Sequence, residues 1–391
     1  MTSKAPSDFS ACYCRGCGYD LRAAVSRCPE CGRDFDPGDP RTFRRRPPRG
    51  AWWRWGKRAL VLLLILFLLV GSAWGWLYWG WKSEQVAVEK FKGGVSLYKP
   101  LGGKWLQAHL GSTGWVLDRA KNLYLGCPAA NVDLPYVEDL KWLQELHLSN
   151  EVTDEELLHI RNCKCLWTLY LNSPNVTDAG LIHLKELTEL RALFLGKRIT
   201  DAGLVHLRKL RELQMLDLAG TEITDAGLAQ VRKFGKLWSL SLEETRVTDA
   251  GMVELKDLKN LRSLDLSNTK ITDAGLVPLK ELKGLECLSL NYTGVTDAGL
   301  VHLKDLRELQ VLYLNHTNVT DEGLVHLKDL AKLRRLYLND TKVADAGLVH
   351  LEDLKGLEDV HLYHTKVTSA GVEALKAAMP RARVSYVYVE E

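Results

Sequence analysis

A five-residue pattern, Thr-Asp-Ala-Gly-Leu, recurs along much of this 391-residue chain. Ten copies, some with small changes, follow one another at a spacing of 24 residues, with one step of 23. The copies begin at Thr153, Thr177, Thr200, Thr224, Thr248, Thr272, Thr296, Thr320, Ala344 and Thr368. A unit of this length cannot bury its own apolar face and must stack on its neighbours. The repeat therefore restricts most of the chain to a solenoid.

Each unit contains two kinds of apolar spacing. In the unit from Leu213 to Val231, the alternation of Leu216 and Leu218 predicts a short strand. Leu228, Val231 and Phe234 then recur at helical spacing, and Thr224 or Asp225 is a suitable N-cap for a helix that starts there. We therefore expect a strand followed by a helix in every repeat.

This order resembles the leucine-rich repeat, whose signature is Leu-x-x-Leu-x-Leu-x-x-Asn-x-Leu. Threonine stands where the signature has Asn or Cys, at Thr221, Thr245, Thr269, Thr293, Thr317, Thr341 and Thr365. The Val-Thr-Asp-Ala-Gly-Leu version is similar to the cysteine-containing or ribonuclease-inhibitor-like class, also seen in F-box receptor proteins. Over residues 137–380, the resemblance implies an α/β horseshoe with a parallel concave sheet and helices on the convex face. We expect the threonine hydroxyls to form a ladder in place of asparagine amides.

The segments on either side of the repeats lack the repeat itself. Residues 82–136 contain leucines and strand-like alternation, which indicates a juxtamembrane segment and an N-terminal cap. Residues 381–391 contain Val384, Tyr386 and Tyr388 at period two, which predicts a C-terminal cap strand.

Four cysteines near the N-terminus have the spacing of metal ligands. Cys14, Cys17, Cys28 and Cys31 form two Cys-x-x-Cys pairs, and a glycine follows each pair. Four thiolates in a tetrahedron suit a structural Zn²⁺, and iron is an alternative with the same ligands. The sequence therefore predicts a zinc-ribbon-like module at residues 1–36, in which Cys12 is not a ligand. A site closed by four thiolates leaves no position for catalysis.

A basic linker and an apolar segment follow this module. Residues 37–58 are rich in Pro and Arg, with eight Lys or Arg and no acid between Arg41 and Arg58. Residues 59–81 contain no charge, with Trp52, Trp53 and Trp55 shortly before them and further tryptophans at their C-terminal end. A helix of that length spans about 35 Å, enough for a bilayer core of about 30 Å. We expect a single transmembrane helix with the N-terminus in the cytoplasm and the repeats outside it, because positive charge precedes the helix.

The outward strand positions on the concave face are the candidate binding surface. In chain order they are His147, Tyr170, Phe194, Asp217, Ser241, Asp265, Ser289, Tyr313, Tyr337 and His361. Aromatic and amide side chains gather toward the C-terminal end, and such side chains often anchor partners. The predicted partner-binding residues are Tyr313, Asn315, Tyr337, Asn339, His361, Tyr363 and His364. The alternative is that aromatic residues are present because they suit strands.

These features favour a non-enzymatic, membrane-anchored protein that recognises a protein or glycan through the concave face. The chain contains no nucleophile elbow, HExxH, Walker loop or dinucleotide fingerprint. A net charge of +3 does not indicate a nucleic-acid partner for the whole molecule, although the zinc module with its basic flank is one alternative site. An F-box-like adaptor for ubiquitin-type degradation is another alternative, but residues 93–135 are glycine-rich and strand-like and do not suggest an F-box helix pair.

The charge asymmetry predicts the topology of the chain in the membrane. The eight basic residues precede the apolar segment, so the C-terminus should lie outside the cytoplasm. A reporter enzyme that works only outside the cytoplasm should therefore be active when it is fused after Glu391. Replacing those basic residues with neutral ones should weaken this preference. A cytoplasmic reporter in the unmodified chain would contradict the prediction.

Overall fold

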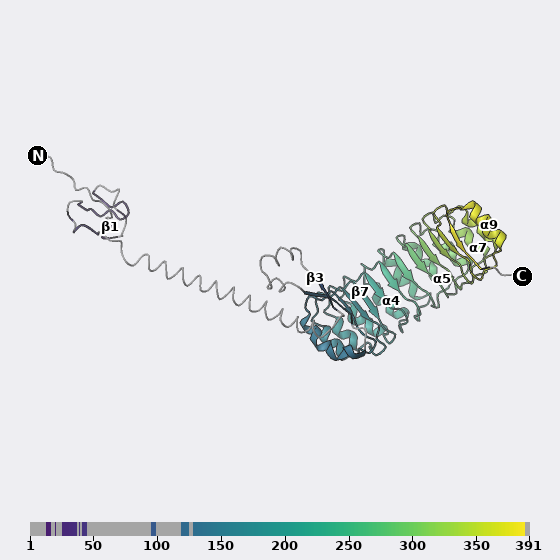
Figure 1. Ribbon diagram of the computed structural model, residues 1–391, viewed down its shortest axis with the longest axis horizontal. Coiled ribbons are helices and arrows are strands. Elements are labelled where there is room, and N and C mark those ends of the chain that lie inside the picture. Colours follow the sequence, from purple (N-terminus) through teal and green to yellow (C-terminus); the bar gives the residue numbers. More distant parts are fainter. Residues whose placement is uncertain are drawn as a thin grey trace. The chain divides into compact units, whose positions relative to one another are not determined.

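The computed structural model describes residues 13–16, 20, 26–36, 39, 41–44, 95–98, 119–124 and 128–387 (Figure 1). The chain forms two compact units, Met1–Trp79 and Gly80–Glu391. The transmembrane helix expected at residues 59–81 lies outside the described residues. Within the described ranges, no helix is both long and apolar enough to cross a bilayer.

The described part of the first unit is small and has little regular structure. Strands β1 (Tyr13–Cys14) and β2 (Phe43–Arg44) pair antiparallel. Cys14 and Phe43 are buried together with Cys28 and Phe35. So small a core needs a further source of stability, which a bound metal would supply.

The second unit is a solenoid built on one long sheet. Strand β3 (Val95–Tyr98) pairs antiparallel with β4 (Arg119–Tyr124), and each later strand adds in parallel to the strand before it. The later strands are β5 (Glu145–His147), β6 (Thr168–Leu171), β7 (Ala192–Leu195), β8 (Met215–Asp217), β9 (Ser239–Ser241), β10 (Ser263–Asp265), β11 (Cys287–Ser289), β12 (Val311–Tyr313), β13 (Arg335–Tyr337), β14 (Asp359–His361) and β15 (Arg383–Ser385). The expected parallel sheet is confirmed.

Helical segments return the chain from each strand to the next, and Figure 1 shows them along one side of the sheet. They are the 3₁₀ helices η2 (Pro128–Asp139), η3 (Glu156–Ile160), η4 (Gly180–Leu184), η5 (Val205–Leu207), η6 (Gly251–Asp257), η7 (Val277–Glu281), η8 (Val301–Leu303), η9 (Val325–Leu327) and η10 (Val349–Leu351), and the α-helices α3 (Asp201–Leu204), α4 (Asp225–Val231), α5 (Asp273–Leu276), α6 (Asp297–Leu300), α7 (Asp321–Leu324), α8 (Asp345–Leu348) and α9 (Ser369–Ala378). Most are single α turns or 3₁₀ segments, shorter than the helices that the spacing suggested. The reason is that each must end before the next buried leucine turns the chain back to the sheet.

The core lies between the sheet and these helical segments. In the three-residue strands the middle side chain is buried, as Leu216, Leu240 and Leu264 show, while in most of them its two neighbours are partly exposed. The helical segments contribute Leu228, Val231 and their equivalents from the other side. The buried side chains form one continuous apolar core that joins all the repeats. Burying each of them stabilises the fold by about 1.5–3 kcal/mol.

Aspartate and threonine of the recurring pentapeptide bond successive repeats together. Asp201 accepts hydrogen bonds from the backbone N–H of Thr224 (2.9 Å) and from its hydroxyl (2.6 Å). The same pair of bonds joins Asp154 to Thr177 and recurs along the solenoid to Asp345 and Thr368. We call this series of contacts the carboxylate relay. The threonine hydroxyl also accepts a bond from the N–H two residues later, as at Ala226, so it is the N-cap.

The glycine of the pentapeptide makes room for this carboxylate. A methyl group at Gly227 would overlap the Asp201 carboxylate, and one at Gly299 would overlap that of Asp273. The same overlap occurs at every glycine of the series. Threonine, aspartate and glycine of the pattern are therefore three parts of one contact between repeats.

The carboxylate relay has a defined first and last member. Among the described side chains, no aspartate of an earlier segment bonds Thr153, and its N–H and hydroxyl instead bond Glu156 Oε2, at 2.8 and 3.1 Å. The bond from the backbone N–H to Glu156 is one half of a capping box. In the last copy of the pattern Ser369 replaces the aspartate, beyond which no further repeat stacks.

The threonine ladder expected at the signature position is different in the structure. The hydroxyl of Thr221 donates to the carbonyl of Leu218 in its own repeat, at 2.6 Å, and Thr245 does the same with Leu242. These threonines are buried, but their hydroxyl bonds do not join repeats. The carboxylate relay makes the connection between repeats instead.

Ala344 interrupts the carboxylate relay and offers a test of it. Asp321 accepts only the backbone N–H of Ala344, at 2.7 Å, and this helix start has no side-chain cap. Replacing Ala344 with threonine should add both hydroxyl bonds and stabilise the solenoid by about 1 kcal/mol, measured as a rise in Tm. Thr320→Ala should lower the Tm by a similar amount. An unchanged Tm in both variants would contradict the role assigned to these hydroxyls.

Candidate functional site

The strand register aligns one side chain from every repeat on the face of the sheet away from the helices, which we call the sheet face. The aligned residues are Tyr124, His147, Tyr170, Phe194, Asp217, Ser241, Asp265, Ser289, Tyr313, Tyr337 and His361. The order expected from the sequence is confirmed. We call this row the central row.

Two groups of stacked rings stand at opposite ends of the central row. Near the C-terminal end, Tyr337 stacks on Tyr313 with ring centroids 4.3 Å apart, and on His361 at 4.5 Å. Near the N-terminal end, the rings of Tyr124, His147, Tyr170 and Phe194 follow at 4.3, 3.8 and 4.1 Å. Because each ring covers the face of its neighbour, the rings present mainly their edges and polar atoms to a partner.

The middle of the sheet face is acidic. Asp217 and Asp265 lie in the central row on either side of Ser241. Glu243 follows two residues after Ser241 in the same repeat. Burial raises the pKa of Glu243, and the carboxylates of Asp265 and Asp217 raise it further. These acids are close enough to repel one another, so a cation of a partner would be stabilised here.

One phenol in each stack has a raised pKa. Burial raises the pKa of Tyr313, and the neighbouring Tyr337 adds to the effect. Burial also raises the pKa of Tyr170, with Glu145 as the second cause. Neutral phenols both donate and accept hydrogen bonds, which suits the polar groups of a peptide backbone.

Two of the candidate binding residues also hold the solenoid together. The side-chain oxygen of Asn315 accepts the backbone N–H of Asn339, and that of Asn339 accepts the N–H of Tyr363, both at 2.9 Å. Asn291 makes the same bond to Asn315. The asparagine ladder that the threonines do not form is therefore present here, two positions earlier in the loop. A partner contact by these amides stays a prediction.

A further row lies just after the strands, where the backbone has positive φ. Tyr292, His316, Asp340 and His364 occupy this conformation at φ between 54° and 57°. Tyr292 stacks on His316 at 4.0 Å. Asp340 bonds His316 on one side (3.2 Å) and His364 on the other (3.1 Å). Non-glycine residues rarely adopt positive φ, and such strain often occurs at functional sites.

Sequence reasoning missed Tyr124 and Asp340 as members of this surface. Tyr124 lies in Asn-Leu-Tyr-Leu, which matches the strand pattern of the repeats without the pentapeptide that marked them. Asp340 was not chosen because its role depends on two histidines that are each 24 residues away. Comparison of equivalent positions in adjacent repeats was the signal that would have found it.

Three of the four expected metal ligands come together in the first unit. The sulfurs of Cys14, Cys28 and Cys31 all lie within 4.8 Å of one another, and those of Cys14 and Cys31 are 3.5 Å apart. A tetrahedral zinc with bonds of about 2.3 Å places its sulfurs about 3.8 Å apart, so this arrangement fits such an ion. The backbone N–H of Gly16 points at the Cys14 sulfur (3.3 Å), as expected beside a thiolate. Cys17, the fourth expected ligand, lies outside the described residues.

The scattered cysteines have different environments. Cys163 is fully buried in the core, and burial raises the pKa of its thiol to about 12. Cys287 is partly exposed on the sheet face, and burial raises the pKa of this thiol as well. Neither thiol is ionised at neutral pH, which makes both poor nucleophiles and poor metal ligands.

The fold and its repeated strand define a leucine-rich-repeat solenoid. A family model described as Leucine Rich repeat matches residues 257–280 and 306–327. An internalin from Listeria monocytogenes is similar in structure, with a TM-score of 0.53 and 22% identity over 66% of this chain and 71% of that one. Internalin C2 from the same organism is 28% identical over 54% of this chain and 84% of its own, with a TM-score of 0.42.

A TDR receptor structure is also similar, with a TM-score of 0.45 and 13% identity over 65% of this chain and 44% of that one. No curated protein matches the sequence. The family model and the first internalin structure support the repeat fold, while the features of the sheet face are described from this chain alone.

The cysteine cluster predicts one metal ion per chain. Elemental analysis of the purified full-length protein should find one zinc, and Cys28→Ser should remove it because the other thiolates cannot complete the tetrahedron. Cys12→Ser is the matched control and should retain the zinc. Iron in place of zinc would select the alternative metal, and an unchanged metal content in Cys28→Ser would show that Cys28 is not a ligand.

Proposed function

We propose that this protein is a membrane-anchored recognition protein that binds a protein partner along the sheet face of its solenoid. The observation that carries the proposal is the pair of stacked aromatic groups at the two ends of the central row, with acids between them. Aromatic side chains supply much of the binding energy of protein interfaces. Neither the fold nor the described residues contribute an arrangement of catalytic groups to this face.

The chemistry of the sheet face favours a protein partner over a glycan. Sugars usually bind aromatic residues through the ring face, but Tyr313, Tyr337 and His361 cover one another's faces. The exposed ring edges, neutral hydroxyls and acidic centre instead suit a partner with backbone amides and a basic side chain. A glycan remains the alternative partner.

We further propose that residues 59–81 anchor the chain in a membrane and that the cysteine module lies on the cytoplasmic side. The charge asymmetry of the sequence supports this orientation. A closed four-thiolate site would stabilise the module without providing chemistry. In this arrangement the solenoid recognises the partner, and the anchor at residues 59–81 keeps the solenoid at the membrane surface.

The C-terminal stack provides the test of the proposed binding face. Replacing Tyr313 and Tyr337 with serine should weaken a captured partner by about 2 kcal/mol or more, since buried aromatic anchors are typical hot spots. Ser241 and Ser289 already occupy equivalent positions, so the fold should tolerate the change with a stability cost of about 0.5 kcal/mol. Affinity capture with the full-length chain, followed by titration of the captured protein, measures the effect.

Trp142→Ser is the matched control, because it removes an exposed aromatic ring from the turn before β5 instead of from the sheet face. This variant should bind as the unmodified chain does. Unchanged binding in the tyrosine variant with a large fall in Tm would show that the stack is structural.

A further inference from the structure

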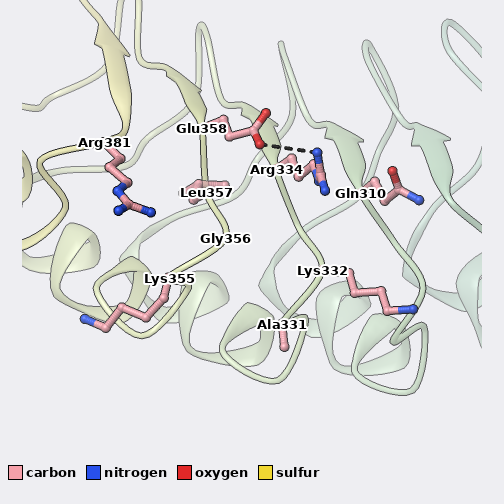
Figure 2. Close-up of a pocket in the computed structure, with 9 residues that line it drawn as sticks. All are labelled: Gln310, Ala331, Lys332, Arg334, Lys355, Gly356, Leu357, Glu358 and Arg381. Carbon is pink, nitrogen blue, oxygen red and sulfur yellow. Dashed lines mark hydrogen bonds and ion pairs between the residues drawn. The ribbon is translucent and has the colours of Figure 1, made fainter.

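A hollow near the C-terminal end of the solenoid lies away from the sheet face. It occupies about 550 Å³ where the chain turns from the helical segments back into β12, β13 and β14. Its lining residues are Gln310, Ala331, Lys332, Arg334, Lys355, Gly356, Leu357, Glu358 and Arg381 (Figure 2). We call it the Gly356 pocket. Its volume is within the range of small-molecule sites, about 300–1,000 Å³.

The hollow exists because two residues of the repeat pattern are small. At the position of Ala331, earlier repeats carry Arg307 and Lys283, and at the position of Gly356 the preceding repeat carries Lys332. Loss of both long side chains in adjacent repeats leaves an open space on the surface. Figure 2 shows that Gly356 and Ala331 line its floor without a side chain that would fill it.

The lining is strongly basic. Lys332, Arg334, Lys355 and Arg381 contribute four cations, and Glu358 is the one acid in the lining. Glu358 pairs with Arg334 at 3.3 Å, and Lys332 pairs with Glu308, outside the pocket, at 2.6 Å. Across the part of the chain that the structure describes, Lys355 and Arg381 have no acidic partner.

Two backbone N–H groups that line the pocket are already bonded, and we assign ligand binding to the side chains. The N–H groups of Leu357 and Glu358 bond the carbonyls of Leu354 and Arg334. Figure 2 shows the side chains of Arg381 and Lys355 on the same side of Gly356, with the guanidinium of Arg381 beside Leu357 and the ammonium of Lys355 at the outer edge. The guanidinium of Arg381 matches an oxyanion with several acceptor oxygens, which arginine binds through two parallel bonds, and the flexible Lys355 side chain adds positive charge beside it.

We propose that the Gly356 pocket binds an anionic ligand that carries phosphate or sulfate groups. Lys355 and Arg381 bind the oxyanion, Arg334 and Gln310 border the opposite side, and the missing side chains of Ala331 and Gly356 provide the space. The site is separate from the sheet face, so such a ligand and a protein partner would not compete for the same residues.

A repeat with similar sequence shows why the site is confined to one place. Lys283-Gly284-Leu285 has the same residues as Lys355-Gly356-Leu357. Around Gly284, however, Lys259 takes the position of Ala331 and fills the space, and Glu308 takes the position of Arg381. Lys283 therefore provides a matched control of the same charge and local sequence.

Titration calorimetry of the full-length protein in about 150 mM salt, which screens diffuse attraction, tests the proposal. The probes are inorganic pyrophosphate and a trisulfated heparin disaccharide, and the tighter of the two identifies the source of the oxyanion. We expect one site per chain and a loss of affinity of about tenfold or more in the double variant Lys355→Gln, Arg381→Gln. Lys283→Gln should change the affinity by less than about twofold.

A second variant tests the hollow and keeps every cation. Ala331→Gln fills the space with a neutral side chain at a position where other repeats carry longer ones, so folding should be preserved, and binding should again weaken about tenfold. Absence of binding to both probes overturns the proposal. Equal weakening by Lys283→Gln, or full affinity in Ala331→Gln, also overturns it, because either result shows diffuse surface charge instead of a shaped site.

Discussion

Each aspartate of the repeated pentapeptide accepts the backbone N–H of the repeat that follows it, and all but Asp321 also accept its threonine hydroxyl, so this contact fixes the distance and rotation between neighbours. A hydrogen bond to a charged group contributes roughly 1.5–3 kcal/mol, less where it is open to water. The bond also requires the glycine, because any side chain there would displace the carboxylate. Once the spacing is fixed, the strands pair without a shift and the leucines meet in one core.

The sheet face follows from that fixed spacing. Since equivalent residues of successive repeats lie side by side, an aromatic residue at one position stacks on the next whenever both repeats carry one. Tyr313, Tyr337 and His361 form such a group, while Ser241 and Asp265 leave the middle of the row open to acids. The sheet face thus differs between repeats at a few positions on an otherwise uniform scaffold, and none of these side chains belongs to the core.

The period of the sequence was sufficient to predict the strands, the buried leucines and the alignment of the central row. It was not sufficient to show what Asp201 or Gly227 does, because their partners belong to another repeat and are visible only in three dimensions. The threonine at the signature position was expected to join repeats, but its hydroxyl reaches only its own backbone. The Gly356 pocket depends on small residues, Ala331 and Gly356, in two adjacent repeats. A motif within one repeat could not predict it.

The carboxylate relay runs in one direction, from the Thr153–Glu156 contact to Ser369. In every internal repeat the aspartate accepts bonds from the repeat that follows, and the start of the helical segment donates to the aspartate of the repeat before. The two ends of the solenoid are therefore chemically different. Duplication of a whole unit would preserve every bond, and the 23-residue step shows that even a single deletion is absorbed in the loop, since Asp178 still bonds Thr200 at 2.8 and 2.6 Å. Duplication or loss of whole repeats can therefore change the length of the sheet face without breaking the contacts between repeats.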